Sequence, residues 1–167
     1  MKTKIEEIMS TALATVKSTD GLLESYIKMK ENKIRHLPVK DSHGDVIGII
    51  SDRDFQRARQ SVPSNSGNDV DFSAGSLVRD YMCSEVKSVP FDTELITVVR
   101  EMIDSKISAV LITSEDKTIG IVTHEDLLKV LADSLYPVED KVVGKIKNWL
   151  SKTPIGEVAR TLALNGI

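Results

Sequence analysis

The hydrophobic and polar positions of this chain follow one pattern twice. A short apolar lead-in precedes a brief alternating segment, an amphipathic stretch, two apolar runs joined by a polar turn, and a second amphipathic stretch. The first copy runs over about 4–60 and the second over about 76–132, and Met9 and Met82 mark equivalent positions 73 residues apart. After a one-residue slip in a turn the offset becomes 72. Such a duplication predicts two copies of one small unit about a pseudo-twofold axis, with function in the cleft between them.

The periodicity within each copy predicts a strand, a helix, two strands and a helix, which makes the fold class α+β. In the first copy these elements are expected at 13–17, after 19–20, at 34–40, at 46–50 and from 51. In the second copy they are expected at 86–90, after 92–93, at 109–113, at 118–122 and from 123. Thr19-Asp20 and Asp92-Thr93 are residue types that cap helices. The apolar faces of the two capped helices are expected to consist of Leu22, Leu23, Tyr26 and Ile27, and of Leu95, Ile96, Val99, Met102 and Ile103.

The pattern divides the chain into a first unit over 1–60, a flexible linker over 61–75, a second unit over 76–133 and a helical tail over 134–167. The tail has no counterpart in the first half of the chain, and its apolar residues recur at helical spacing. It is expected either to contact a second copy or a partner, or to fold over its own domain. The candidates for this contact are Val142, Ile146 and Trp149.

Composition excludes several classes of protein. The chain has 167 residues, of which 41% are hydrophobic and 28% charged, as in soluble globular proteins. A net charge of −3 gives no general attraction to nucleic acid. The single cysteine cannot form an intramolecular disulfide, the N-terminus lacks the apolar core of a signal peptide, and no apolar stretch could span a bilayer. These features predict a cytoplasmic protein without a membrane partner.

One motif occurs once in each copy at matching positions. It reads Gly, two apolar residues, Ser or Thr, two further residues and Asp, and it covers 48–54 and 120–126. It places a hydroxyl and a carboxylate where a strand becomes a helix, an arrangement that suits phosphate binding and hydrogen bonds from a ribose diol. The same spacing is also that of a helix capping box. Because a duplication copies a cap as faithfully as a site, both interpretations stay open on this motif.

A second pattern accompanies the first. The segments 13–16 and 86–89 both read apolar, any residue, Ser or Thr, apolar, and the first copy adds the run Ile-Arg-His-Leu-Pro-Val at 34–39. With the Gly-to-Asp motif, this layout resembles a tandem pair of CBS domains, a Bateman module, over about 4–132. The resemblance implies β-α-β-β-α units packed sheet to sheet, with clefts that bind AMP, ADP, ATP or S-adenosylmethionine.

The resemblance also implies roles for individual residues. The ribose would be held by Asp54, Asp126, Ser51 and Thr123. The adenine would contact Leu13, Thr15, Val16, Val86, Ser88, Val89, Ile34 and Ile107. The chain departs from the family pattern where Ala12 and Glu85 replace a glycine and where Lys17 replaces the proline that the second copy keeps as Pro90.

The two copies differ in their cations. The candidates for phosphate binding are Arg35, His36 and Arg53 in the first copy and His124 in the second. Ser108, Ala109 and Glu125 stand where the first copy has Arg35, His36 and Arg53. We therefore expect two sites of unequal strength, with phosphates drawn toward the first copy.

The sequence offers no catalytic residues and no metal site, since its three histidines lack ligand-like spacing and no nucleophile, base and acid come together. The expected function is a regulatory module, not an enzyme, that senses AMP, ADP or ATP, requires no cofactor, forms a homodimer and acts on an unidentified regulated protein. Two alternatives stay open: an interaction or dimerisation module with vestigial clefts, and an S-adenosylmethionine sensor. Nucleic acid is not an expected partner, because the lysines of the tail lie among acidic residues.

Overall fold

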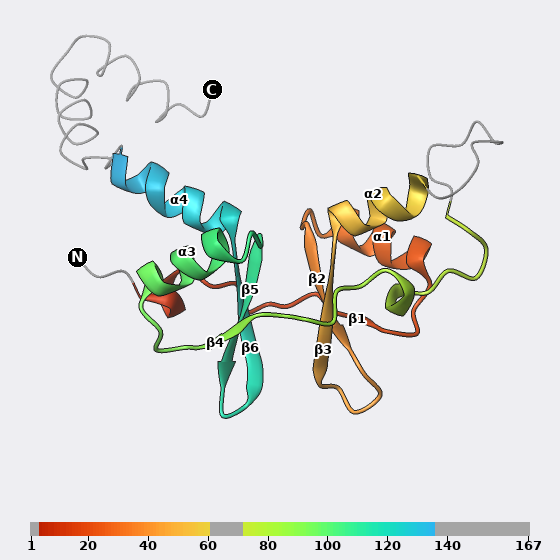
Figure 1. Ribbon diagram of the computed structural model, residues 1–167, viewed down its shortest axis with the longest axis horizontal. Helices are drawn as coiled ribbons and strands as arrows, with labels where there is room; N and C mark the ends of the chain where they lie inside the picture. Colours follow the sequence, from red (N-terminus) through yellow and green to blue (C-terminus); the bar gives the residue numbers. More distant parts are fainter. Residues whose placement is uncertain (1–3, 61–71, 136–167) are drawn as a thin grey trace, which may run out of the picture. The chain divides into compact units, whose positions relative to one another are not determined.

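The computed structural model describes residues 4–60 and 72–135, and the helices and strands are labelled in Figure 1. The elements of the first repeat are η1 (Ile5–Glu7), β1 (Val16–Lys17), α1 (Leu22–Glu31), β2 (His36–Lys40), β3 (Val46–Ser51) and α2 (Asp52–Gln60). Those of the second repeat are η2 (Val78–Asp80), β4 (Ser88–Pro90), α3 (Leu95–Asp104), β5 (Ala109–Ser114), β6 (Lys117–Thr123) and α4 (His124–Leu135). The tail residues Val142, Ile146 and Trp149 and most of the predicted linker, 61–71, lie outside the described residues.

Each repeat contains one three-stranded sheet of the same topology. In the first sheet β1 pairs in parallel with β2, and β2 pairs antiparallel with β3. In the second sheet β4, β5 and β6 repeat this order and these directions. A parallel pair needs a crossover connection, which α1 and α3 supply, whereas the antiparallel pairs are closed by short turns. The duplication seen in the sequence is therefore a duplication of one β-α-β-β-α unit.

Helices cover one face of each sheet, and a separate apolar cluster joins the sheets. In the first repeat α1 and α2 lie on the same side of their sheet (Figure 1) and bury Leu22, Met29 and Phe55 against its strands. The joining cluster combines Ile49 of β3 with residues of β5 and β6. Its buried members are Ala109, Leu111 and Ile121. The predicted α+β fold, with two units packed sheet to sheet, is confirmed.

The segments that lead into the repeats, which contain η1 and η2, each pack on the other repeat. Ile5, from the lead-in of the first repeat, is fully buried in the core of the second repeat. Val78, from the lead-in of the second repeat, is fully buried in the core of the first. Each lead-in also forms a β-bridge with a strand of the other repeat, Ser10 with Ile121 and Cys83 with Ile49. This exchange ties the two repeats together through backbone and core.

Of two local predictions for α1 and α3, the helix caps were wrong and the apolar faces were right only in part. The N-cap positions are held by Gly21 and Glu94, neither of which makes a side-chain capping bond, in place of Thr19-Asp20 and Asp92-Thr93. The expected apolar faces were right only in part: Leu22 and Met102 are buried as expected, but Ser25 and Met29 of α1 and Val98 of α3 are buried as well. Four of the expected face residues are exposed, namely Leu23, Ile27, Ile96 and Ile103.

The chain divides into two compact units, Met1–Leu127 and Leu128–Ile167. Both sheets and the exchanged lead-ins belong to the first unit. The described part of the second unit is the end of α4, where Leu128, Leu131 and Leu135 are exposed. None of the helices in the described ranges combines the length and the apolar character needed to cross a bilayer.

Candidate functional site

The two Gly-to-Asp motifs form the same corner in both repeats, at β3–α2 and at β6–α4. Asp54 Oδ2 accepts hydrogen bonds from Ser51 N at 2.8 Å and from Ser51 Oγ at 2.6 Å. Asp126 Oδ2 accepts the equivalent bonds from Thr123 N at 2.9 Å and from Thr123 Oγ1 at 2.7 Å. Each aspartate is thus held rigidly at the first turn of a helix, where the backbone N–H groups favour negative charge. One of the two bonds of a capping box, from the backbone N–H of Ser51 or Thr123 to the aspartate, is formed in both copies.

In the first repeat the other carboxylate oxygen also has a partner. Asp54 Oδ1 forms an ion pair with Nη2 of Arg57, one turn further along α2. The Asp54 side chain is 14% exposed and that of Arg57 is 69% exposed, so the carboxylate lies near the protein surface beside an exposed cation. A ribose diol that approached Asp54 would share the carboxylate oxygens of Asp54 with Ser51 and Arg57.

The residues expected around adenine separate into two groups. Leu13 and Val86, one from each repeat, both pack against the cluster that joins the sheets. Val16 instead lies in the first core, 4% exposed, and Val89 packs against the second core. Ile34 packs against the first core and Ile107 against the second. The structure therefore brings Leu13 and Val86 to a common boundary, while the other four apolar side chains face their own cores.

The polar residues of the same segments, Thr15 and Ser88, differ in how their backbone groups are already bonded. The carbonyl oxygen of Thr15 accepts a hydrogen bond from Lys28 Nζ at 2.7 Å. Ser88 is exposed and begins β4, where it is paired with Leu111. If the segments 13–16 and 86–89 bind the edge of adenine, they would do so through backbone N–H and C=O groups that strand pairing leaves unbonded.

His36 connects the two repeats directly. Its Nε2 lies 2.8 Å from Oγ of Ser108, the residue that corresponds to Arg35 in the second repeat. Burial lowers the pKa of His36 to about 4, and the Arg35 charge adds to this effect. Weaker contributions come from Asp54, which raises the pKa, and from His124 and Arg53, which lower it. His36 is therefore uncharged at neutral pH and can offer a phosphate a hydrogen bond but no charge.

The remaining candidate cations are exposed. Arg35, Arg53 and His124 all have exposed side chains. Asp52 N donates to Arg35 O at 3.0 Å, and His124 N donates to Ser108 O at 3.1 Å, so the backbones around both corners match. The two corners thus share geometry and differ in charge, since Arg35 and Arg53 of the first corner have Ser108 and Glu125 as their counterparts in the second.

Sequence reasoning missed three residues of this region. Ser108 was taken only as a missing cation, although its hydroxyl contacts His36. Arg57 and Lys28 were not considered, because they lie on helices outside the motifs. Arg57 of α2 contacts Asp54, and Lys28 of α1 contacts the Thr15 carbonyl oxygen. The spacing of Arg57, three residues after Asp54 on a helix, was a signal that could have identified the ion pair.

Comparison with known proteins identifies the repeat. The sequence model of the CBS domain matches residues 5–61 and again residues 78–133. An uncharacterized 17.7 kDa protein of Acidianus ambivalens is 34% identical over 134 residues, which are 80% of this chain and 76% of that protein. A CBS domain-containing protein of Dictyostelium discoideum is 28% identical over 142 residues, covering 83% of this chain and 97% of that protein.

Solved structures share the arrangement of both repeats. A conserved protein of Pyrococcus horikoshii superposes with a TM-score of 0.66 at 28% identity, covering 78% of this chain and 92% of that one. The CBS domain pair of protein MJ0100, crystallised with 5′-methylthioadenosine and S-adenosyl-L-methionine, superposes with a TM-score of 0.65 at 25% identity. That superposition covers 77% of this chain and 99% of the other.

Proposed function

Because this chain belongs to the CBS domain family, as a tandem pair, we propose that it is a regulatory module that binds AMP, ADP or ATP where its two repeats meet. The observation that carries the proposal is the matched pair of carboxylates, Asp54 and Asp126, each fixed beside a hydroxyl at the start of a helix. A carboxylate in this position can accept both hydrogen bonds of a ribose diol. The adenosine compounds bound to the CBS pair of protein MJ0100 support an adenosine ligand.

The other groups would then complete the ligand site. Leu13 and Val86 would pack against adenine, since they share the apolar cluster between the sheets. Arg35 and Arg53 would hold the phosphates of a ligand in the first site, because they are exposed cations beside the Asp54 corner. His36, uncharged at neutral pH, would donate a hydrogen bond. We propose the second site as the weaker one for phosphates, because Ser108 and Glu125 replace Arg35 and Arg53.

S-adenosylmethionine is the second candidate ligand. It shares the ribose that Asp54 or Asp126 would bind, and it is one of the ligands of the related CBS pair. It has no phosphate, so the absence of a charged His36 costs it nothing. The second corner, with Thr123 and Asp126 and no arginine at the positions of Arg35 and Arg53, suits this ligand better than a polyphosphate.

Regulation would follow from ligand binding across the repeats. A ligand that contacts both repeats shifts the balance between conformations only by the difference in its affinity for them. We propose that the protein acts as a homodimer and passes this shift to a regulated protein. The exposed leucines of α4, Leu128, Leu131 and Leu135, are candidates for such contacts, because they recur at helical spacing.

Calorimetric titration with AMP, ADP, ATP and S-adenosylmethionine tests the proposal. We expect saturable binding of one phosphate-bearing nucleotide, with affinity reduced about 10- to 100-fold in Asp54→Asn, because a hydrogen-bonded charge is lost. Asp52→Asn is the matched control, since it removes the same charge from the same helical turn but pairs with Lys30. Asp126→Asn reports on the second site in the same way.

Each outcome of this titration is informative. Binding of S-adenosylmethionine alone, weakened by Asp126→Asn, would favour the second candidate. Equal loss in Asp54→Asn and Asp52→Asn would mean that helix charge, not a ribose contact, is responsible. Flat traces for all four ligands, from folded and nucleotide-free protein, would contradict the proposal and leave an interaction module.

A further inference from the structure

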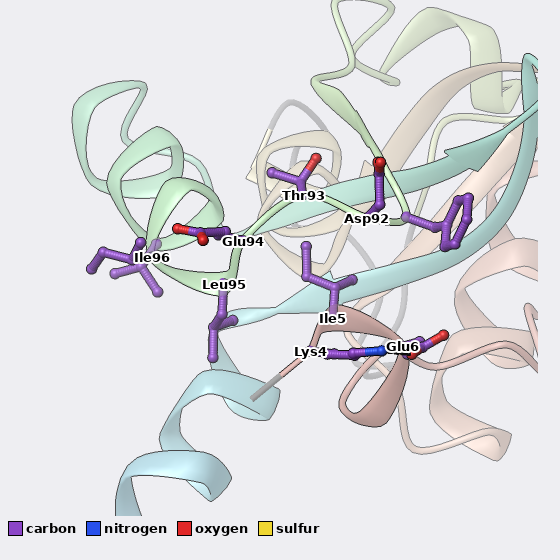
Figure 2. A pocket seen from close by; sticks show the side chains of 10 residues that line it. Lys4, Ile5, Glu6, Asp92, Thr93, Glu94, Leu95 and Ile96 are labelled. Atoms are coloured by element: carbon purple, nitrogen blue, oxygen red, sulfur yellow. Dashed lines mark ion pairs between the residues drawn. The ribbon is translucent and has the colours of Figure 1, made fainter. Parts of the chain in front are cut away.

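A pocket of about 550 Å³ lies away from the proposed nucleotide site, between the η1 turn and the start of α3. Its apolar lining comes from Ile5, Leu95, Ile96 and Val99. Figure 2 shows Ile5 between the turn that carries Lys4 and Glu6 and the segment that carries Asp92, Thr93 and Glu94. None of the residues expected to bind ribose, adenine or phosphate lines it. Its volume is in the range of small-molecule sites.

The first repeat shows what occupies the equivalent place there. Leu95, Ile96 and Val99 correspond to Leu22, Leu23 and Tyr26, and the frame is the same, since Gly21 bridges Leu77 as Glu94 bridges Lys4. In the first repeat Phe72 packs against one of these residues, Tyr26, and against Phe55. Its ring centroid lies 5.7 Å from that of Tyr26 and 6.1 Å from that of Phe55, in edge-to-face contact. An aromatic ring thus packs beside Tyr26 in the first repeat.

The second repeat lacks these rings. Val99 replaces Tyr26, Leu127 replaces Phe55, and Phe72 has no counterpart among residues 4–60 and 72–135. Val99 lines the pocket, and apolar surface there is in contact with solvent: Ile96 is 53% exposed and Phe91, also at the pocket, is 44% exposed. Covering this surface with a ring would recover its transfer free energy.

The rim of the pocket is acidic. Lys4 pairs with Glu6 at 3.3 Å, so its charge is compensated within the rim. Asp92 and Glu94 add two further carboxylates, and the four charged lining residues sum to a formal charge of −2. A ligand with a positive charge beside its ring would be attracted, and a carboxylate in that place would be repelled.

We propose that this pocket binds a small aromatic molecule that carries a positive charge, of the aromatic amine class. Its ring would contact Val99 as Phe72 contacts Tyr26 in the first repeat, and its ammonium group would face the acidic rim at Asp92. The site is independent of the nucleotide site, so the failure of one proposal leaves the other untouched.

Two probes of similar size and opposite charge test the proposal, 2-phenylethylamine and 3-phenylpropanoate. In a titration followed by amide chemical shifts, we expect saturable shifts around 91–99 with the amine and affinity at least about tenfold weaker with the carboxylate. Ile96→Lys places a cation in the pocket at an exposed position and should weaken the amine by about tenfold. Ile103→Lys is the matched control, the same substitution on the same helix at a 66% exposed residue that does not line the pocket.

Several results would overturn the proposal. Equal affinity for both probes would remove the role of the rim, and shifts outside the pocket would place the ligand elsewhere. Binding that requires deletion of residues 1–3 would make the N-terminal end of this chain the occupant. Binding of a basic phenylalanine-containing peptide but not of the amine would make the pocket a protein-docking site.

Discussion

In the first repeat, α2 carries Phe55 into an aromatic cluster with Tyr26 and Phe72, whereas the second repeat has Val99 and Leu127 at the positions of Tyr26 and Phe55. Both repeats keep the same strand order and the same exchanged lead-in. The backbone plan therefore tolerates either an aromatic or an aliphatic interior. What changes between the repeats is the packing at the surface: Phe72 packs on Tyr26 in the first repeat, whereas Val99, the counterpart of Tyr26, lines a pocket in the second.

The corners near the repeat boundary differ in a similar way. Ser51 and Asp54 are matched by Thr123 and Asp126 to within about 0.1 Å in their hydrogen bonds. The charges around them do not match, because Arg35 has a serine as its counterpart. A duplicated scaffold has thus kept its rigid geometry while its two copies have become chemically distinct.

Removing the central aromatic ring should give the largest difference between the repeats. We expect Phe55→Ala to lower the free energy of unfolding by about 3–5 kcal/mol, because a fully buried ring leaves a cavity. Leu127→Ala, at the equivalent half-buried position, should cost only about 1–2 kcal/mol. Urea unfolding followed by circular dichroism measures both. Equal losses would mean that the aromatic cluster adds nothing specific to the first repeat.

The features that repeat along the sequence were predicted well. The duplication placed both sheets and the Ser51–Asp54 and Thr123–Asp126 corners, because strand alternation and strand-to-helix motifs are local signals. The helix faces were less predictable. Leu23 and Ile27 are apolar and at helical spacing, yet exposed, since the face that a helix buries is set by its packing partner and not by composition alone.

Contacts between the repeats could not be read from the sequence. The exchange of lead-ins places Ile5 in the core of the other repeat, and nothing in a linear pattern distinguishes a residue packed at home from one packed on the neighbour. The linear pattern likewise did not show that Val16 lies in the core of its own repeat and not at the boundary between the repeats. The His36–Ser108 contact joins positions 72 residues apart, so it depends on how the two units are placed.

Acid should destabilise the protein through His36. This effect belongs to the first repeat, because the second repeat has Ala109 at the position equivalent to His36. The folded-state pKa of about 4 lies below the value of an unfolded histidine, so the unfolded state binds more protons between these two values. Stability then falls as the pH is lowered through this window, by about 2 kcal/mol between roughly pH 7 and pH 5. His36→Ala, which makes the repeats alike, should remove this part of the pH dependence in urea unfolding. An unchanged slope would contradict it.

The smallest expected difference concerns two glycines in equivalent strands, Gly48 in β3 and Gly120 in β6. A Cβ at Gly48 would lie 2.9 Å from the Cys83 carbonyl oxygen and 2.9 Å from the Met82 sulfur. A Cβ at Gly120 would lie 2.8 Å from the Met9 sulfur, while the nearest backbone oxygen is 3.3 Å away. The lead-in of the opposite repeat therefore crosses both glycines, but only at Gly48 does its backbone approach this closely.

A methionine sulfur at the end of a flexible side chain can move aside, whereas the Cys83 carbonyl is fixed by a hydrogen bond from Ile49 N at 2.9 Å. We therefore expect Gly48→Ala to cost about 1–2 kcal/mol of stability, and Gly120→Ala close to none, since reduced freedom of the unfolded chain offsets about 0.4–1 kcal/mol. Thermal unfolding of both variants measures this difference. Adding Met82→Ala should leave most of the Gly48→Ala loss in place, because the backbone clash stays. Full rescue would assign the clash to the sulfur and make the two glycines equivalent.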